Sequence, residues 1–172
     1  MLRRREPRRA VAAVEFAFLA PLLLILLFGL WQVGHIIEVV QLMDNAAREG
    51  ARLASQAEII NQIGSYTLVH ANSGLPNVQD TVREYLVAAG VVQASQVNDV
   101  QVAFKFLTGD TTRTDPYLGQ QGDLFTVTVT LPVQDINWTP FSASGNLVAQ
   151  TTWAILVDTP FTVNTTIPGW SP

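Results

Sequence analysis

The sequence has no cysteine and only two histidines. The absence of cysteine excludes disulfides, thiolate zinc sites, iron–sulfur clusters and a thiol nucleophile. Of the two histidines, His35 and His70, the first has no second ligand spaced to join it at a metal. A glycine-rich phosphate loop, an HExxH motif and a recognisable Ser/His/Asp arrangement are also missing. We therefore expect no catalytic, cofactor-binding or metal-binding residues, no cofactor, and a function that is not enzymatic.

Positive charge is scarce after the first ten residues. Half of the ten basic residues are arginines at the start of the chain, namely Arg3, Arg4, Arg5, Arg8 and Arg9. The rest of the chain holds five basic and thirteen acidic residues, a formal net charge of −8 without a basic stripe, which argues against a nucleic-acid partner. Because basic residues beside a membrane segment stay in the cytoplasm, we expect the acidic part to be exported.

Polar side chains are missing altogether from Phe16 to Trp31. Extending this run back to Val11 gives twenty-one residues interrupted only by Glu15, and a helix needs about 20 to cross a bilayer. A removable signal peptide requires small residues at a cleavage site just after the run, whereas residues 31–37 are mostly bulky. We therefore expect residues 11–34 to remain in the protein as one transmembrane helix with its N-terminus inside.

The helical pattern continues beyond the membrane segment. Apolar or small residues recur at alternating spacings of four and three, at Ile36, Val40, Met43, Ala47, Gly50, Ala54 and Ala57. A polar flank accompanies them, made of Glu38, Gln41, Asn45, Arg48, Arg52 and Ser55, with Asp44 and Arg48 spaced as an ion pair. This predicts one helix from about residue 11 to about residue 60, roughly 75 Å long, with a mild kink at Pro21. The small residues would allow either another helix or the chain's own sheet to pack closely against this helix.

The remaining residues predict a small α+β domain. Residues 64–77 read as a loop, and residues 78–89 as an amphipathic helix closed by Gly90. Its expected buried face comprises Val78, Val82, Tyr85, Leu86 and Ala89. Alternating runs near 100–106, 125–131 and 147–157 then predict a small antiparallel sheet packed on helix, with Trp153 in its core. The expected segments are a basic leader (1–10), a transmembrane helix (11–34), its extracytoplasmic continuation (35–60), an α+β domain (61–158) and an irregular tail (159–172).

Two stretches of the chain resemble a known family. Residues 8–24, RRAVAAVEFAFLAPLLL, and residues 45–54, NAAREGARLA, resemble the N-terminal part of TadE-like proteins, which are pilin-like components of the Tad type IV pilus machinery. The resemblance covers about residues 8–57 and implies a pilin-like fold. It also implies that a prepilin peptidase cleaves between Ala10 and Val11, which places Glu15 and Phe16 at positions five and six of the mature chain. Such families usually carry Gly before the cut, where this chain has the similarly small Ala10.

Glu15 is the residue on which this interpretation depends. Cleavage would free an α-amino group at Val11, one helical turn from Glu15, and the carboxylate of one subunit could then pair with the ammonium of the next. Such a pair is strong in a low-dielectric medium and would fix the register of neighbouring subunits. The alternative is a Glu15 that lies solvated at the cytoplasmic interface among the arginines.

The resemblance implies a pseudopilin in the bacterial cytoplasmic membrane, which enters the pilus through helix-to-helix contacts. Its expected partners are other pilin-like subunits (a TadF-like protein and the major pilin), the prepilin peptidase, the inner-membrane assembly platform and membrane lipid. The alternative is a signal-anchored extracytoplasmic binding domain that is unrelated to pili. The sequence does not separate a TadE role from a TadF role.

Two further groups of residues have an ordinary and a functional interpretation. Asp110, Asp115 and Asp123 could hold calcium, but Gly109, Pro116, Gly119 and Gly122 also fit a solvated hairpin connection. Among the aromatic residues Trp138, Phe141, Phe161 and Trp170, the two tryptophans are candidates for subunit contacts or for ordinary packing. The sequences at Asn137 and Asn164 match the glycosylation pattern, which has many false positives.

Overall fold

The computed structural model describes residues 8–60, 65–136 and 145–156. The chain divides into two compact units, Met1–Val39 and Val40–Pro172, and each is described by itself. Several expectations fall outside the described residues. They are those for Arg3 to Arg5, for Trp138, Phe141, Phe161 and Trp170, for Asn137 and Asn164, and for the tail 159–172.

The first helix, α1, extends from Arg8 to Ser55 and contains Pro21. The sequence predicted an end near residue 60, which is wrong by about one turn. The last turn tightens, because the amides of Gln56 and Ala57 bond to carbonyls three residues earlier at 3.2 and 3.1 Å. Ala57 then adopts a left-handed φ of 52°, which turns the chain out of the helix.

A short hairpin follows, which the sequence did not predict. Strand β1 (Glu58–Ile60) pairs antiparallel with β2 (Tyr66–Leu68), so that Ile60 lies opposite Tyr66. The region from residue 64 to residue 77, expected to be a loop, therefore contains one strand. Three residues per strand are too few for an alternating pattern to be distinguished from a loop.

The second helix, α2, extends from Val78 to Ala88. Asn77 caps its start, with Oδ1 accepting a hydrogen bond from the Asp80 amide at 2.7 Å. At its end Gly90 has a φ of 73°, and the amides of Gly90 and Val91 donate to Val87 and Leu86 at 3.0 Å each. This bonding is that of a Schellman motif, so the predicted closure by Gly90 is confirmed.

The buried face of α2 was predicted in part. Val78, Val82 and Leu86 are buried as expected, whereas Tyr85 is half-buried. Ala89 is exposed, because the chain has already turned away from the helix axis at the C-cap.

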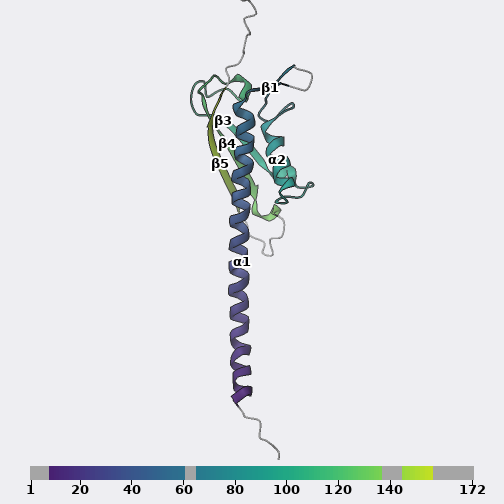
Figure 1. Ribbon diagram of the computed structural model, residues 1–172, viewed down its shortest axis with the longest axis vertical. Coiled ribbons are helices and arrows are strands. Elements are labelled where there is room, and N and C mark those ends of the chain that lie inside the picture. The colour runs from purple at the N-terminus through teal and green to yellow at the C-terminus, as the bar shows by residue number, and fades with distance from the viewer. Residues whose placement is uncertain (1–7, 61–64, 137–144, 157–172) are drawn as a thin grey trace, which may run out of the picture. The chain divides into compact units, whose positions relative to one another are not determined.

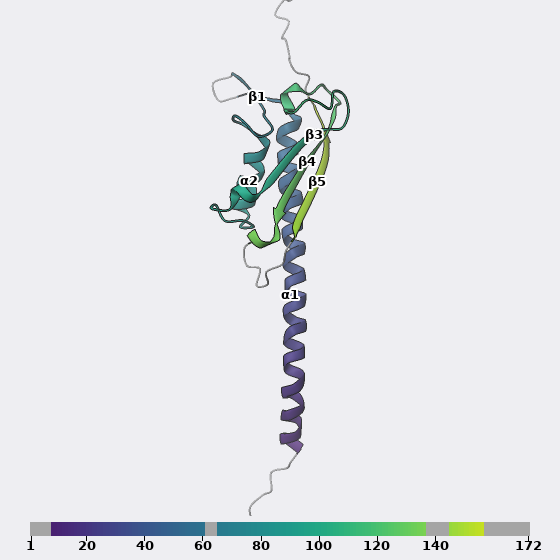
Figure 2. The ribbon, with the colours of Figure 1, turned by 180° about the vertical axis from the view of Figure 1, so that it is seen from behind.

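The sheet has three antiparallel strands in the order β3 (Gln101–Phe106), β4 (Leu124–Pro132) and β5 (Asn146–Ala154). Figures 1 and 2 show the strands side by side, with α2 beside β3. Short 3₁₀ turns occur at Val97–Asp99, Pro116–Leu118 and Val133–Asp135. The predicted α+β class, with a long helix, a second helix and a small antiparallel sheet, is confirmed.

One face of the sheet forms the core of the second unit. Phe125, Val127, Val129 and Leu131 of β4 are buried and alternate with threonines. Phe106 of β3 lies opposite Phe125, and their ring centroids are 6.5 Å apart. Trp153 pairs with Phe125 in register but is 38% exposed, so its expected place in the core is wrong. β5 is an edge strand, so within the described residues Trp153 has a neighbouring strand on one side only.

The predicted seam of small residues on α1 is buried in the second unit at Met43, Ala47, Gly50, Ala54 and Ala57. Gly50 faces α2 so closely that a Cβ atom there would lie 2.6 Å from Val82 Cγ2 and 3.1 Å from Val78 Cγ1. The neighbour at Gly50 is therefore α2.

The polar flank of this segment differs from the prediction at two places. Ser55 is buried, because its hydroxyl donates to the Arg52 carbonyl at 2.7 Å and its own carbonyl accepts from Leu156. Glu49 pairs with Arg52 at 2.6 Å, whereas within the described residues Asp44 and Arg48 form no ion pair.

Candidate functional site

The first unit presents an apolar helical surface from Val11 to Trp31. Every residue from Val11 to Leu19 is exposed, including Val11 at 56% and Phe16 at 65%. By length and composition α1 could cross a membrane, and none of its most apolar window is buried. The unit therefore offers a long apolar surface that lipid or neighbouring helices can cover.

Glu15 breaks this surface at one point. It lies four residues after Val11, and residues four apart in an α-helix lie on the same side about one turn from each other. Glu15 is exposed, and within the described part of the chain it forms no ion pair. Among the described residues, its carboxylate therefore has no cationic partner.

The other predicted residues of this segment lie along the same helix. Ala10 and Val11 belong to its first turns, and Phe16 follows Glu15 about 100° further around the axis. The helix continues through Pro21, which has no amide hydrogen to donate to the Ala17 carbonyl. The sequence predicted a helix that begins near residue 11, so Val11, Glu15 and Phe16 lie on it as expected, whereas Ala10 was expected in the leader and also lies on α1.

His35 lies further along the first unit. Its ring stacks on Trp31 with centroids 6.2 Å apart, and its Nδ1 lies 3.7 Å from Glu38. Among the described residues there is no group of three or more His, Asp or Glu side chains that could hold a metal ion.

The aspartates of the loop between β3 and β4 each bond to a different protein donor. Asp110 Oδ1 accepts from the amide and the hydroxyl of Thr112, at 3.0 and 2.7 Å. Asp115 Oδ1 accepts from the Ala71 amide at 2.9 Å, and Asp123 pairs with Arg113 at 2.6 Å. The structure does not bring the three carboxylates together, so they do not form a calcium site.

The hydrogen bonds to Asp110 affect its titration. Both bonds from Thr112 stabilise the charged carboxylate, and the Arg113 cation adds a smaller attraction, so the pKa of Asp110 is lowered. Asp110 is fully exposed, so its hydrogen bonds with Thr112 affect only the local conformation of the loop.

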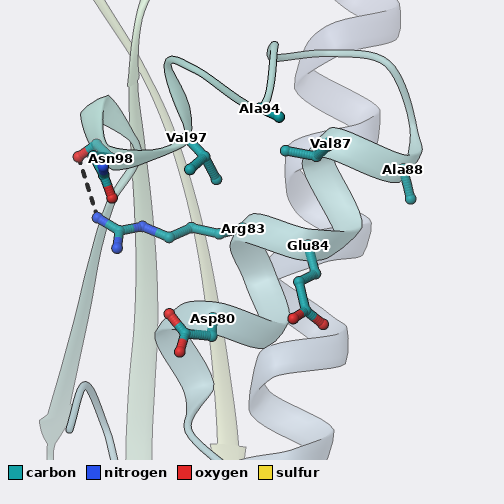
Figure 3. A pocket seen from close by; sticks show the side chains of 8 residues that line it. All are labelled: Asp80, Arg83, Glu84, Val87, Ala88, Ala94, Val97 and Asn98. Atoms are coloured by element: carbon teal, nitrogen blue, oxygen red, sulfur yellow. Dashed lines mark hydrogen bonds between the residues drawn. The ribbon is translucent and has the colours of Figure 1, made fainter.

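A groove beside α2 is a second candidate site, and the sequence analysis missed it. Its volume is about 410 Å³, and its lining comprises Asp80, Arg83, Glu84, Val87, Ala88, Ala94, Val97 and Asn98. Figure 3 shows Asp80 and Glu84 at one end and Val87 and Ala94 toward the other. The spacing of Asp80 and Glu84, one turn apart on a helix, was the available signal.

Arg83 does not add a free cation to this groove. Its guanidinium donates to the Val100 carbonyl at 3.0 and 3.2 Å and to the Asn98 carbonyl at 3.1 Å. These bonds hold the 3₁₀ turn Val97–Asp99 against α2. The charged groups at the groove that form no ion pair among the described residues are therefore the carboxylates, above an apolar floor.

A comparison with protein families covers the segment that holds the first of these two candidate sites. The model of the TadE-like protein family matches residues 10–52, about a quarter of the chain. The match begins at Ala10 and contains Val11, Glu15, Phe16, Pro21 and the seam around Gly50. The resemblance to TadE-like proteins is thus confirmed for this segment. No curated protein and no solved structure matches the chain.

Proposed function

We propose that this protein is a TadE-like pseudopilin, which acts without a reaction of its own in assembling the Tad pilus and in adherence to surfaces. The observation that carries the proposal is the match at residues 10–52, over a helix that presents Glu15 on an otherwise apolar surface. A structural subunit needs such a surface for its neighbours, whereas an isolated membrane anchor gains nothing from a carboxylate there.

In this proposal the peptidase cleaves between Ala10 and Val11 on the cytoplasmic side and removes the arginine-rich leader. The new ammonium group of Val11 then pairs with Glu15 of an adjacent subunit. The attraction between two opposite charges is strong in lipid, and leaving either charge unpaired there costs free energy. The pairing therefore favours one axial offset between neighbouring helices. Residues 11–34 span the cytoplasmic membrane, and the acidic second unit lies outside. The remaining partners are a TadF-like protein, the major pilin and the assembly platform.

The first test is the mass of the mature N-terminus in protein from the cells that make it. A chain that starts at Val11 supports the proposal. An intact Met1, or a start beyond residue 34, supports an anchored binding domain without a pilus role. Ala10→Gly is the matched variant, and processing is expected to remain efficient because Gly is the usual residue before such cuts.

The second test is the substitution of Glu15. Glu15→Ala is expected to insert in the membrane at wild-type levels but to be incorporated into the pilus at least about tenfold less, since an unpaired ammonium would be left in lipid. Glu38→Ala, which removes a carboxylate later on the same helix, is the control. Equal incorporation of Glu15→Ala and wild type would contradict the registry role.

A further inference from the structure

We propose that the groove beside α2 binds the Arg48 face of α1 from a second copy of this chain. This inference rests on the proposed function, because it supplies a contact between exported domains of assembled subunits. Neither the groove nor its occupant follows from the pairing of Glu15 in the membrane.

The two surfaces lie on opposite sides of one helix pair. Gly50 and Val82 mark where α1 and α2 face each other. Each residue of a helix advances about 100° around the axis, so Arg48 lies about 200° from Gly50. Glu84 likewise lies about 200° from Val82. Both side chains are exposed and point away from the contact between the helices.

Surfaces on opposite sides of a subunit meet head to tail. When the groove of one copy takes the Arg48 face of the next, the pair retains one open Arg48 face on the first copy and one open groove on the second. Such a heterologous contact repeats without closing unless its rotation happens to form a ring. It is the type of contact that a helical assembly of identical subunits needs.

Charge identifies Arg48 as the occupant. Within the described part of the second unit, Arg52, Arg83 and Arg113 are bonded to protein acceptors. Arg48 and Lys105 are exposed and form no ion pair there. Arg48 lies on a helical ridge with Asn45 and Arg52, which can enter a groove, whereas Lys105 lies on the flat face of the sheet.

The shape and chemistry of the groove suit an arginine side chain. Its floor of Val87, Ala88, Ala94 and Val97 can cover the aliphatic stem. At the acidic end, Glu84 forms no ion pair among the described residues, and Asp80 accepts one hydrogen bond from Asn77 at 2.8 Å. Both carboxylates retain acceptor positions that the donors of a guanidinium can fill.

Cross-linking between copies tests this contact directly. Because the chain has no cysteine, Asn45→Cys on the Arg48 face and Ala88→Cys at the groove introduce unique reporter thiols. Full-length protein with both substitutions is treated, in membranes of the native cells, with a bismaleimide too short to join the two sites within one chain. We expect a ladder of dimers, trimers and longer species.

Charge reversal shows whether Arg48 and Glu84 make the contact. In the reporter chain, Arg48→Glu and Glu84→Arg alone are each expected to lower the linked fraction by at least about fivefold, since like charges then meet. The double reversal is expected to restore it. Lys105→Glu makes the same change of charge elsewhere and is expected to leave the ladder intact.

The outcomes separate this inference from the proposed function. The contact is contradicted if no ladder forms or if the single charge reversals leave the ladder unchanged. It is also contradicted if Lys105→Glu abolishes the ladder. The N-terminus of the same samples is read by mass. A chain that starts at Val11 without a ladder contradicts only the groove contact. A ladder on chains that keep Met1 supports the contact and contradicts the pseudopilin role.

Discussion

Arg113 illustrates how one side chain holds an otherwise exposed loop. Its guanidinium lies 4.8 Å from the Phe106 ring centroid and donates to the Asp110 and Leu118 carbonyls and to Asp123. The side chains of Arg113 and Asp123 are 14% and 13% exposed, so the ion pair is largely removed from water. The loop expected to be a solvated hairpin connection is therefore held to the sheet at this residue.

Arg113→Ala is expected to lower the free energy of unfolding by about 2–4 kcal/mol, because it leaves the mostly buried Asp123 carboxylate without its cation. Arg113→Lys keeps the charge but loses the fork of donors, and is expected to lose about half as much. Denaturant unfolding of the full chain in detergent, followed by tryptophan fluorescence, measures both. An Arg113→Ala variant that unfolds at the wild-type midpoint would show that the loop does not depend on this residue.

Gly50 provides a second prediction at the scale of single residues. Gly50→Ala places a methyl group 2.6 Å from Val82 Cγ2, and the overpacking is expected to cost about 1–3 kcal/mol despite the better helix propensity of alanine. The same change at Gly34, where no atom lies within 4 Å of the new Cβ, is the control and should not destabilise the protein. In a Val82→Ala background the cost of Gly50→Ala should shrink markedly. An additive double mutant would contradict the contact.

Asp110 gives a prediction that depends on pH. Because the bonds from Thr112 lower its pKa in the folded state, folding is favoured above the unfolded pKa, and this contribution is lost as the pH falls through the folded pKa. NMR titration of the carboxyl carbon should find a midpoint below the ordinary value of about 3.9, and Thr112→Ala should raise it. An unchanged midpoint in Thr112→Ala would show that Thr112 is not the cause.

At the scale of elements, the closure of α2 depends on Gly90, where the left-handed backbone conformation alone explains why the residue is glycine. Gly90→Ala forces a left-handed φ on a residue with a Cβ, while no neighbouring atom lies within 4 Å of the added methyl. The expected loss is about 1 kcal/mol of unfolding free energy. Gly90→Asn is expected to lose less, since asparagine tolerates this conformation better. Equal stability of all three chains in thermal unfolding would contradict a left-handed Gly90.

Elements were predictable where a pattern extends over enough residues. The period of two in β3, β4 and β5 and the repeat along α1 and α2 each determined an element and most of its buried face, with exceptions at the edge strand and at the end of α2. The hairpin β1–β2 has three residues per strand and carries no such pattern. The end of α1 was missed because it depends on the left-handed conformation of Ala57, and the burial of Ser55 depends on a carbonyl that receives the amide of distant Leu156.

At the scale of the molecule, the candidate site in the first unit was predictable because it is local. Val11, Glu15 and Phe16 lie within six consecutive residues, and their placement needs only helical geometry. The groove beside α2 could not be predicted from the spacing of Asp80 and Glu84 alone, because the carbonyls of Asn98 and Val100 come to Arg83 through hydrogen bonds across a turn. Likewise, the ion pair of Arg113 with Asp123 spans ten residues of irregular chain, for which no periodic pattern exists.

The orientation of the whole molecule is the final prediction. Five arginines precede the apolar segment, and after it no lysine or arginine occurs before Arg48, so this bias of arginines should hold the N-terminus in the cytoplasm. Replacement of Arg3, Arg4, Arg5, Arg8 and Arg9 by serine is expected to leave most chains with the acidic unit on the cytoplasmic side. A membrane-impermeant maleimide reads the orientation in intact cells through Asn45→Cys, which should be labelled from outside in the parent chain and poorly in the variant. The control variant combines Arg48→Ser with Arg52→Ser. It removes two arginines that follow the apolar segment and should leave the labelling of Asn45→Cys unchanged. If the five-serine chain is labelled as fully as its parent, the orientation is determined elsewhere in the sequence.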